Sequence, residues 1–207
     1  MKEKTLFFCQ SCGYESPKWL GRCPACGEWN RFVEERAIRS DAAHPRYSGP
    51  GKDDGPVPID RIEADDGERI RTGIAEMDRV LGGGIVPGSS VLVGGDPGIG
   101  KSTLMLQVVE ALARRGKKGL YISGEESARQ IKLRGSRVGA SSENLLVYVE
   151  IALEKILREI RSAAPHVVVV DSIQTLYSAD LASAPGSVGQ VRESSEQLIL
   201  LAKKTGI

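Results

Sequence analysis

The sequence lacks three features that would place a protein in a membrane, outside the cell or on a highly charged partner. No run approaches the roughly 18 consecutive apolar residues that a membrane-spanning helix needs. The apolar stretch in residues 1–8 is too short for a secretory signal peptide and leads directly into cysteines. The formal net charge is only +1, so composition predicts no particular partner. We therefore expect a cytoplasmic protein.

The chain does have the composition of a folded protein. It contains 207 residues, of which 41% are hydrophobic and 27% charged, and this length suits one mid-sized domain beside a small module. We predict a cysteine ribbon over residues 1–36, a flexible linker over 37–60 and an α/β core over 61–207.

All four cysteines lie in the first 26 residues, as two C-x-x-C pairs with ten residues between them: Cys9, Cys12, Cys23 and Cys26. A glycine follows each pair and lets the backbone turn sharply beneath the sulfurs. Each pair can hold one edge of a metal ion, and two pairs complete the tetrahedral four-sulfur shell that zinc prefers. We predict structural Zn²⁺, and we expect metal binding to supply most of the folding free energy of so small a segment.

Two other interpretations of the cysteines are less favourable. Disulfides are not expected without an export signal. A redox C-x-x-C usually occurs singly, beside a thioredoxin-like strand and helix. Aromatic residues near the cysteines are expected to pack around the metal, although the two tryptophans could instead stack on nucleic-acid bases; these residues are Tyr14, Trp19, Trp29 and Phe32.

Residues 37–58 mix glycine, proline and charged residues. Such a composition cannot bury apolar area, so it predicts a tether. His44 falls in this stretch and is interpreted as a solvated loop residue, with a fifth metal ligand as the alternative. Helical spacing of apolar residues returns at 74–81.

The apolar run at 90–94 predicts a parallel strand buried on both faces. A glycine-rich loop and an apolar helix over 104–113 follow it, which is the context of a phosphate-binding P-loop. The loop residues, all predicted to bind nucleotide, are Gly95, Asp96, Pro97, Gly98, Ile99, Gly100, Lys101 and Ser102.

The loop's spacing has a physical reason. Glycines let backbone N–H groups turn toward phosphates, and the helix N-terminus adds its positive end. We expect Lys101 to reach the β- and γ-phosphates of ATP, Ser102 to ligate Mg²⁺, and Thr103 to contact the α-phosphate. The alternative is a glycine-rich turn without a ligand, which the strand and helix on either side disfavour.

A second apolar strand is predicted at 119–123, and acidic residues follow it. A carboxylate at the carboxyl end of a strand beside the P-loop lies where an attacking water would sit. Glu125 is our candidate for polarising that water, and Glu126 is the weaker choice. Alternatively, both are first-turn residues of the next helix, favoured by its dipole.

A third strand at 145–149 and an amphipathic helix at 153–160 precede a β-branched run at 167–170 that ends in Asp171. This is the Walker B pattern, in which a buried strand delivers one carboxylate to the Mg²⁺ shell. His166 lies at the opposite end of that strand and is expected to be structural.

These motifs together resemble the bacterial RadA (Sms) DNA-repair family, whose core is RecA-like. Besides the four cysteines, the resemblance is carried by residues 72–73, 78–84, 94–103, 121–127, 170–172 and 184–193. It implies a RecA-like P-loop NTPase core with a mostly parallel sheet, preceded by the zinc ribbon. It also implies that Glu125 is the catalytic glutamate, and Lys101, which we expect to reach the phosphates, is the other candidate catalytic residue.

The resemblance further implies a DNA-dependent ATPase that binds single-stranded and branched DNA and processes recombination intermediates. Such proteins act as hexameric rings that drive branch migration alongside RecA, and a replicative helicase is another possible partner. Gln190 and Arg192 match the stretch that faces DNA in RecA-like cores. Alternatively, they belong to a polar loop that enters a helix over 191–204.

The chain ends at Ile207, whereas the family continues with further core strands, a Lys-Asn-Arg-Phe-Gly segment and a Lon-like domain. In such cores ATP sits between subunits, and basic residues from a neighbour complete the γ-phosphate site. We therefore expect this chain to look C-terminally truncated, to bind ATP or ADP and to hydrolyse ATP weakly on its own. The alternatives are a KaiC-type signalling ATPase and a non-catalytic, nucleotide-gated docking module.

Overall fold

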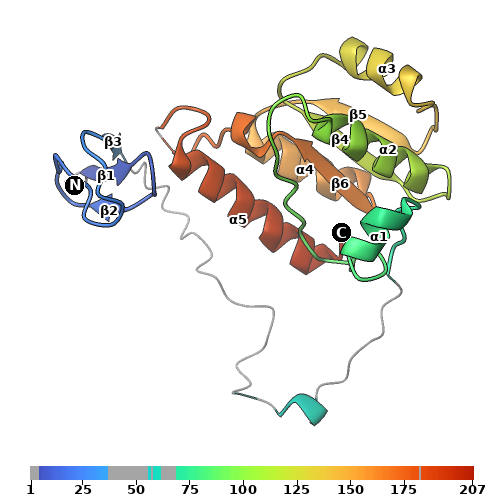
Figure 1. Ribbon diagram of the computed structural model, residues 1–207, viewed down its shortest axis with the longest axis horizontal. Coiled ribbons are helices and arrows are strands. Elements are labelled where there is room, and N and C mark those ends of the chain that lie inside the picture. The colour runs from blue at the N-terminus through green and yellow to red at the C-terminus, as the bar shows by residue number, and fades with distance from the viewer. Residues whose placement is uncertain (1–4, 37–55, 57, 62–68, 182) are drawn as a thin grey trace.

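The computed structural model describes residues 5–36, 56, 58–61, 69–181 and 183–207 (Figure 1). The predicted linker, with His44, lies mostly outside these residues, so its flexibility stays a prediction. Its described part includes the short helix η1 (Ile59–Arg61). No helix among the described residues is long and apolar enough to cross a membrane.

The cysteine segment forms a small antiparallel sheet of its own. It consists of β1 (Thr5–Cys9), β2 (Glu15–Ser16) and β3 (Phe32–Arg36), in the order β2-β1-β3. Its core is formed by Cys9, Cys23 and Phe32. This core is very small, as expected of a unit that depends on a metal.

The larger unit is built on a parallel sheet in the order β5-β4-β6. Its strands are β4 (Gly119–Ser123), β5 (Leu145–Val149) and β6 (Val167–Asp171). The chain passes from β4 to β5 through α3 (Ala128–Arg137), and from β5 to β6 through α4 (Leu153–Ala163). These elements confirm the predicted α/β fold class.

Helices cover both faces of this sheet (Figure 1). On one face, α2 (Lys101–Ala113) and α3 pack against Tyr121 of β4. On the other, α4 and α5 (Val188–Thr205) pack against Leu120 and Ile122. Because neighbouring side chains of a strand point to opposite faces, β4 is buried along its whole length between the two helical layers.

The prediction of a strand at residues 90–94 is wrong. Residues 89–96, between α1 (Ala75–Val80) and α2, belong to no strand. Val91 is 50% exposed and Leu92 87% exposed, so the run is not buried on both faces. An apolar run can favour an extended backbone, but a strand also requires a neighbour that completes its ladder, and no described strand pairs with this segment.

The chain leaves β6 through a short helix and a loop before it enters α5. Helix η2 (Ile173–Thr175) follows β6 almost immediately. Within α5, Leu201 is buried against the α4 side of the sheet. The helix begins three residues earlier than the sequence predicts, because Ser187 caps it by accepting a hydrogen bond from the backbone N–H of Gln190.

Candidate nucleotide and metal sites

The P-loop is shaped by glycines at its turns. Gly98 and Gly100 have φ angles of 80° and 102°, in the left-handed region that residues with a Cβ rarely adopt. Gly100 is the N-cap of α2, so the backbone N–H groups of the helix start face the loop without a side-chain cap. Unsatisfied N–H groups at a helix N-terminus attract anions, and the dipole of this 13-residue helix adds to the effect.

Lys101 lies at the start of α2 and folds back over the loop. Its ammonium donates hydrogen bonds to the carbonyl oxygens of Gly95 (2.7 Å) and Asp96 (2.9 Å). These bonds hold the positive charge directly above the P-loop. A phosphate group would compete with both carbonyls for the same ammonium, and a charged acceptor forms the stronger bond.

Ser102 and Asp171 meet across the boundary between helix and sheet. The Ser102 hydroxyl donates to Asp171 Oδ1 at 3.0 Å. Asp171 is the last residue of β6 and pairs in register with Ser123 of β4, so its carboxylate lies at the carboxyl end of the sheet. A hydroxyl and a carboxylate are the hard oxygen donors that Mg²⁺ prefers, and their proximity fits the predicted magnesium position.

Two further residues surround Asp171, and the sequence analysis did not identify either one. The buried phenol of Tyr121 donates to Asp171 Oδ2 at 2.5 Å. Burial, together with this hydrogen bond to the carboxylate, raises the pKa of Tyr121, so the phenol remains a donor at neutral pH. Arg134 of α3 donates to the phenol oxygen at 2.9 Å.

The two acidic candidates after β4 lie in different surroundings. Glu125 is exposed, and its Oε1 accepts a hydrogen bond from the Ser172 hydroxyl at 2.7 Å. Glu126 instead forms an ion pair with Arg134 at 2.7 Å. Glu125 therefore has an accessible carboxylate beside the Asp171 position, whereas the carboxylate of Glu126 is occupied by a guanidinium.

The four cysteine sulfurs converge, all within 4.8 Å of one another. The Cys9 and Cys26 sulfurs are 3.7 Å apart, and those of Cys12 and Cys23 are 3.6 Å apart. Tetrahedral zinc with Zn–S bonds of about 2.3 Å separates its sulfurs by about 3.8 Å, so the geometry fits a four-thiolate metal site. All four cysteines are free thiols, in agreement with the prediction that they form no disulfides.

The aromatic residues of the ribbon divide into two groups. Phe32 is buried beside Cys9 and Cys23, as predicted. Trp19 and Trp29 are 51% and 66% exposed, so they do not pack around the metal site as expected. The Trp19 indole N–H donates to the Phe32 carbonyl, which fixes that ring at the ribbon surface.

The two residues predicted to face DNA differ sharply in exposure. Arg192 is exposed, so its predicted contact with DNA stays a prediction. Gln190 is fully buried, and its amide accepts from the Ser178 N–H and donates toward the carbonyls of Ser178, Leu181 and Ser183. Its side chain connects α5 to the preceding loop and is not available to a DNA strand, so we no longer count it as a DNA contact. His166 is structural, because its ring nitrogen accepts from the Lys118 N–H.

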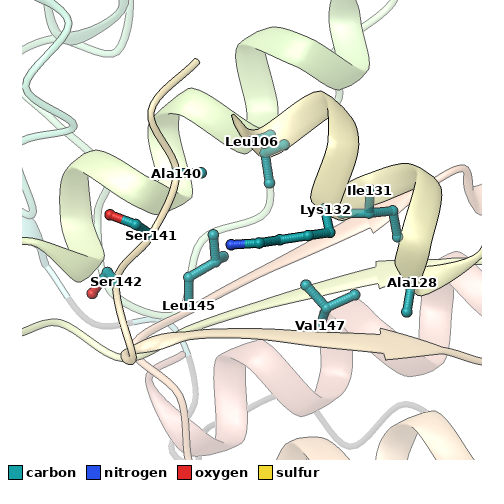
Figure 2. A pocket seen from close by; sticks show the side chains of 10 residues that line it. Leu106, Ala128, Ile131, Lys132, Ala140, Ser141, Ser142, Leu145 and Val147 are labelled. Carbon is teal, nitrogen blue, oxygen red and sulfur yellow. The ribbon is translucent and has the colours of Figure 1, made fainter. Parts of the chain in front are cut away.

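A separate cavity of about 130 Å³ lies between α2, α3 and β5. Figure 2 shows the side chain of Lys132 lying across it, with Leu145 and Val147 below. None of the residues that line this cavity belongs to the P-loop or is Asp171. This cavity is therefore separate from the P-loop and from Asp171.

The described geometry agrees with known protein families. Residues 70–162 match the ATPase family described as KaiC, and residues 7–34 match the family described as a rubredoxin metal binding domain. The whole chain is 51% identical to DNA repair protein RadA of Listeria monocytogenes and of Bacillus subtilis, and 49% identical to that of Halalkalibacterium halodurans. The chain spans about 45% of the length of each of these relatives.

The fold and the two sites define a KaiC-like and RecA-like P-loop ATPase core preceded by a four-cysteine metal-binding ribbon. In particular, the chain is similar along its whole length to the proteins named RadA, which confirms the resemblance that the sequence motifs indicate.

Proposed function

We propose that this chain is the Mg·ATP-binding part of a DNA-dependent ATPase of recombinational DNA repair. The observation that carries the proposal is the convergence of Lys101, Ser102 and Asp171 at one end of the sheet, in a chain whose relatives are named DNA repair proteins. An ammonium, a hydroxyl and a carboxylate in this arrangement are the groups that bind a nucleoside triphosphate with its metal.

The proposed chemistry uses these residues in turn. Lys101 exchanges its carbonyl partners for the β- and γ-phosphate oxygens, while the N–H groups at the start of α2 bind the phosphates from below. Ser102 and Asp171 would hold Mg²⁺, which would neutralise part of the phosphate charge. Glu125 accepts the proton of the attacking water through the carboxylate oxygen that Ser172 leaves free.

We also propose that the metal of the ribbon is Zn²⁺. The proposal is supported by four sulfurs that all lie within 4.8 Å of one another, as in a closed structural site with no position left for chemistry. Without the metal, the ribbon retains a core of only Cys9, Cys23 and Phe32 with a few partly buried neighbours. The role of the metal is therefore to stabilise the fold of the ribbon, and the metal takes no part in hydrolysis.

For the whole protein we propose a hexameric ring that binds single-stranded and branched DNA, acts with RecA and a replicative helicase, and promotes branch migration. Support comes from the similarity to RadA proteins and from the exposed position of Arg192 at the start of α5. Because a neighbouring subunit completes the γ-phosphate site in such rings, we expect this chain alone to bind ATP better than it hydrolyses it.

The decisive experiment measures binding of a fluorescent ATP analogue to the 207-residue chain, with Mg²⁺, in the presence and absence of single-stranded DNA. We expect saturable ATP binding whose affinity changes when DNA is added. In a DNA-dependent ATPase the two ligands are coupled, and each then changes the affinity for the other by the same factor. Absence of ATP binding by a folded chain would refute the nucleotide site. ATP binding that is indifferent to bound DNA would leave the nucleotide site standing and contradict the DNA-dependent function.

A further inference from the structure

Behind the proposed magnesium carboxylate lies a hydrogen-bonded pair of side chains from two other elements. Tyr121 reaches Asp171 from the middle of β4, and Arg134 reaches Tyr121 from α3. The Arg134 guanidinium carbon also lies 5.7 Å from the centre of the Tyr121 ring. We propose that Tyr121 and Arg134 are positioning residues that orient Asp171 toward Mg²⁺; this inference rests on the proposed Mg·ATP-binding function.

The two carboxylate oxygens of Asp171 have different partners. Oδ2 accepts the Tyr121 phenol at 2.5 Å, and Oδ1 faces the Ser102 hydroxyl at 3.0 Å. A carboxylate held at one oxygen cannot rotate freely about its terminal torsion. The bond to Oδ2 therefore fixes Oδ1 on the side where the helix start and the P-loop lie, which is the side on which the metal would bind.

Tyr121 itself is held rigidly. Its ring is fully buried in the cluster formed with Leu106, Val109 and Ile131. The strand therefore fixes the backbone of this residue and two helices fix its ring, so the phenol oxygen has little freedom. A donor on such a support aligns its acceptor far better than an exposed serine or a water would.

The positive charge of Arg134 lies near two carboxylates. Arg134 Nη2 lies 2.7 Å from Glu126 Oε2 and 3.7 Å from Asp171 Oδ2. One guanidinium thus stands between two carboxylates, and the three groups together keep one negative charge. Arg134 holds the phenol in place from behind while Glu126 offsets part of its charge, so Asp171 is not neutralised as a ligand.

A purely structural role is the competing explanation, because a buried phenol needs a hydrogen-bond partner in any protein. The two explanations differ in what they predict for magnesium. Loss of a structural bond lowers stability and affects all ligands equally. Loss of a positioning bond raises the Mg²⁺ concentration that ATP binding requires, and leaves metal-free nucleotide binding unchanged.

The test titrates Mg²⁺ against binding of a fluorescent ATP analogue to the full 207-residue chain. Tyr121→Phe removes one hydroxyl and retains the ring, and Arg134→Gln removes the charge behind it. Outer-sphere partners of metal ligands typically contribute 10- to 100-fold in affinity, so we expect the half-saturating Mg²⁺ concentration to rise about tenfold in either variant. Binding measured in a chelator should stay within about twofold of the wild-type value, and Arg134→Lys should recover part of the magnesium dependence.

Arg137→Gln, at the exposed end of the same helix, is the matched control and should behave like the wild type. The inference is overturned if folded Tyr121→Phe and Arg134→Gln both keep the wild-type magnesium dependence, or if metal-free binding weakens by the same factor. If Tyr121→Phe does not fold, the partly exposed Arg134 position decides the question by itself. Failure of the wild type to bind Mg·ATP would refute the proposed function instead, so the two failures are distinguishable.

Discussion

The hydroxyl of Ser102 lies 3.0 Å from Oδ1 of Asp171, although 69 residues separate the two in the chain. Ser102 belongs to the first turn of α2, and Asp171 is the last residue of β6. Their contact exists only because α2 packs against the sheet through Leu106 and Val109. The geometry of the proposed nucleotide site therefore depends on the packing of α2 against the sheet. The contact between Ser102 and Asp171 links the local P-loop motif to the tertiary fold.

Lys101→Ala should weaken ATP binding while the fold survives. The ammonium contacts only loop carbonyls and is not needed by the core, whereas a phosphate would accept charge-assisted bonds from it. Such bonds contribute about 1.5–3 kcal/mol, which corresponds to a loss of about 10- to 100-fold in affinity. Titration with a fluorescent ATP analogue measures the loss, and thermal melting of the variant checks the fold. Unchanged affinity would remove Lys101 from the site.

Glu125→Gln and Glu126→Gln should impair different steps. Glu125 is exposed beside Ser172, so its amide variant should bind ATP normally and lose about 100-fold or more of any hydrolysis rate. Glu126 is paired with Arg134, so Glu126→Gln should disturb magnesium dependence more than the chemical step. Single-turnover hydrolysis of radiolabelled ATP separates the two carboxylates. A rate defect confined to Glu126→Gln would reverse the assignment of the catalytic base.

The parts of the fold that the sequence predicts are those in which one local pattern is sufficient. The run at Val167 to Asp171 forms the predicted strand, because four β-branched residues favour an extended, buried backbone and β4 completes its ladder. The four cysteines form one metal site because their spacing in the sequence brings the sulfurs together. The strand expected at 90–94 failed because its pattern is also local, whereas a strand requires a partner that the pattern does not supply.

Side-chain networks were hidden from the sequence for a similar reason. Nothing near Tyr121 in the sequence marks it as a partner of Asp171, since the contact joins two neighbouring strands with α3 behind them. The DNA contact predicted for Gln190 follows from its match to the stretch that faces DNA in RecA-like cores, and such a match does not reveal burial. Its burial depends on the path of the loop that holds Ser178 and Ser183, and that path follows from no local rule.

Removal of the metal should unfold the ribbon and leave the core intact. Both tryptophans of the chain, Trp19 and Trp29, lie in the ribbon, so tryptophan fluorescence reports on this unit alone. A strong chelator, or Cys9→Ser, should therefore lower the fluorescence anisotropy of the tryptophans, because unfolding breaks the bond between the Trp19 indole and the Phe32 carbonyl. Elemental analysis should find one zinc per chain before treatment. Iron in place of zinc would refute the proposed metal, and unchanged anisotropy after metal loss would refute its structural role.

The core should retain its ATP affinity in the same chelation experiment once Mg²⁺ is restored, since the four sulfurs converge on one another and the buried cluster of the ribbon contains no P-loop residue. Lys18→Ala, at an exposed position of the ribbon, is the control for nonspecific effects of ribbon substitutions. A fall in ATP affinity that follows the fluorescence change would contradict the independence of the two sites.

The stability contributed by Glu150 should depend on pH. Hydrogen bonds from Lys155 and from the N–H groups of Ala152 and Ile151 lower the pKa of Glu150 to about 2. A carboxyl whose pKa is lower in the folded state stabilises the fold above its ordinary pKa of about 4.5 and loses this effect as pH falls toward 2. Glu150→Gln should therefore be about 1 kcal/mol less stable at pH 7, allowing for solvent screening, and the difference should shrink below pH 4.5.

Urea unfolding of both proteins at pH 7, 5, 4 and 3 measures that difference. Glu143 is an exposed glutamate just before β5, and Glu143→Gln is the control. Its difference in stability from the wild type should show no comparable dependence on pH. A gap between wild type and Glu150→Gln that stays constant or widens as the pH falls would show that the bonds act without regard to the charge of Glu150.

Gln190→Ala should destabilise the core far more than other substitutions in the same helix. The fully buried amide bonds to the backbone of Ser178, Leu181 and Ser183, so its removal leaves buried polar groups without partners. Each unpaired group costs about 1–3 kcal/mol, and we expect a total loss of about 3 kcal/mol, measured by urea unfolding.

Gln197→Ala is the matched control, because this glutamine of α5 is only partly buried and bonds to Glu193 one turn away. Its loss should stay within about 0.5 kcal/mol. Arg192→Ala should be equally mild for stability and should weaken binding of single-stranded DNA with a smaller dependence on salt, as expected when one phosphate contact is lost. If Gln190→Ala were as stable as Gln197→Ala and instead lost DNA binding, the buried amide would be a DNA contact after all, and Arg192 would no longer be needed to explain the interaction.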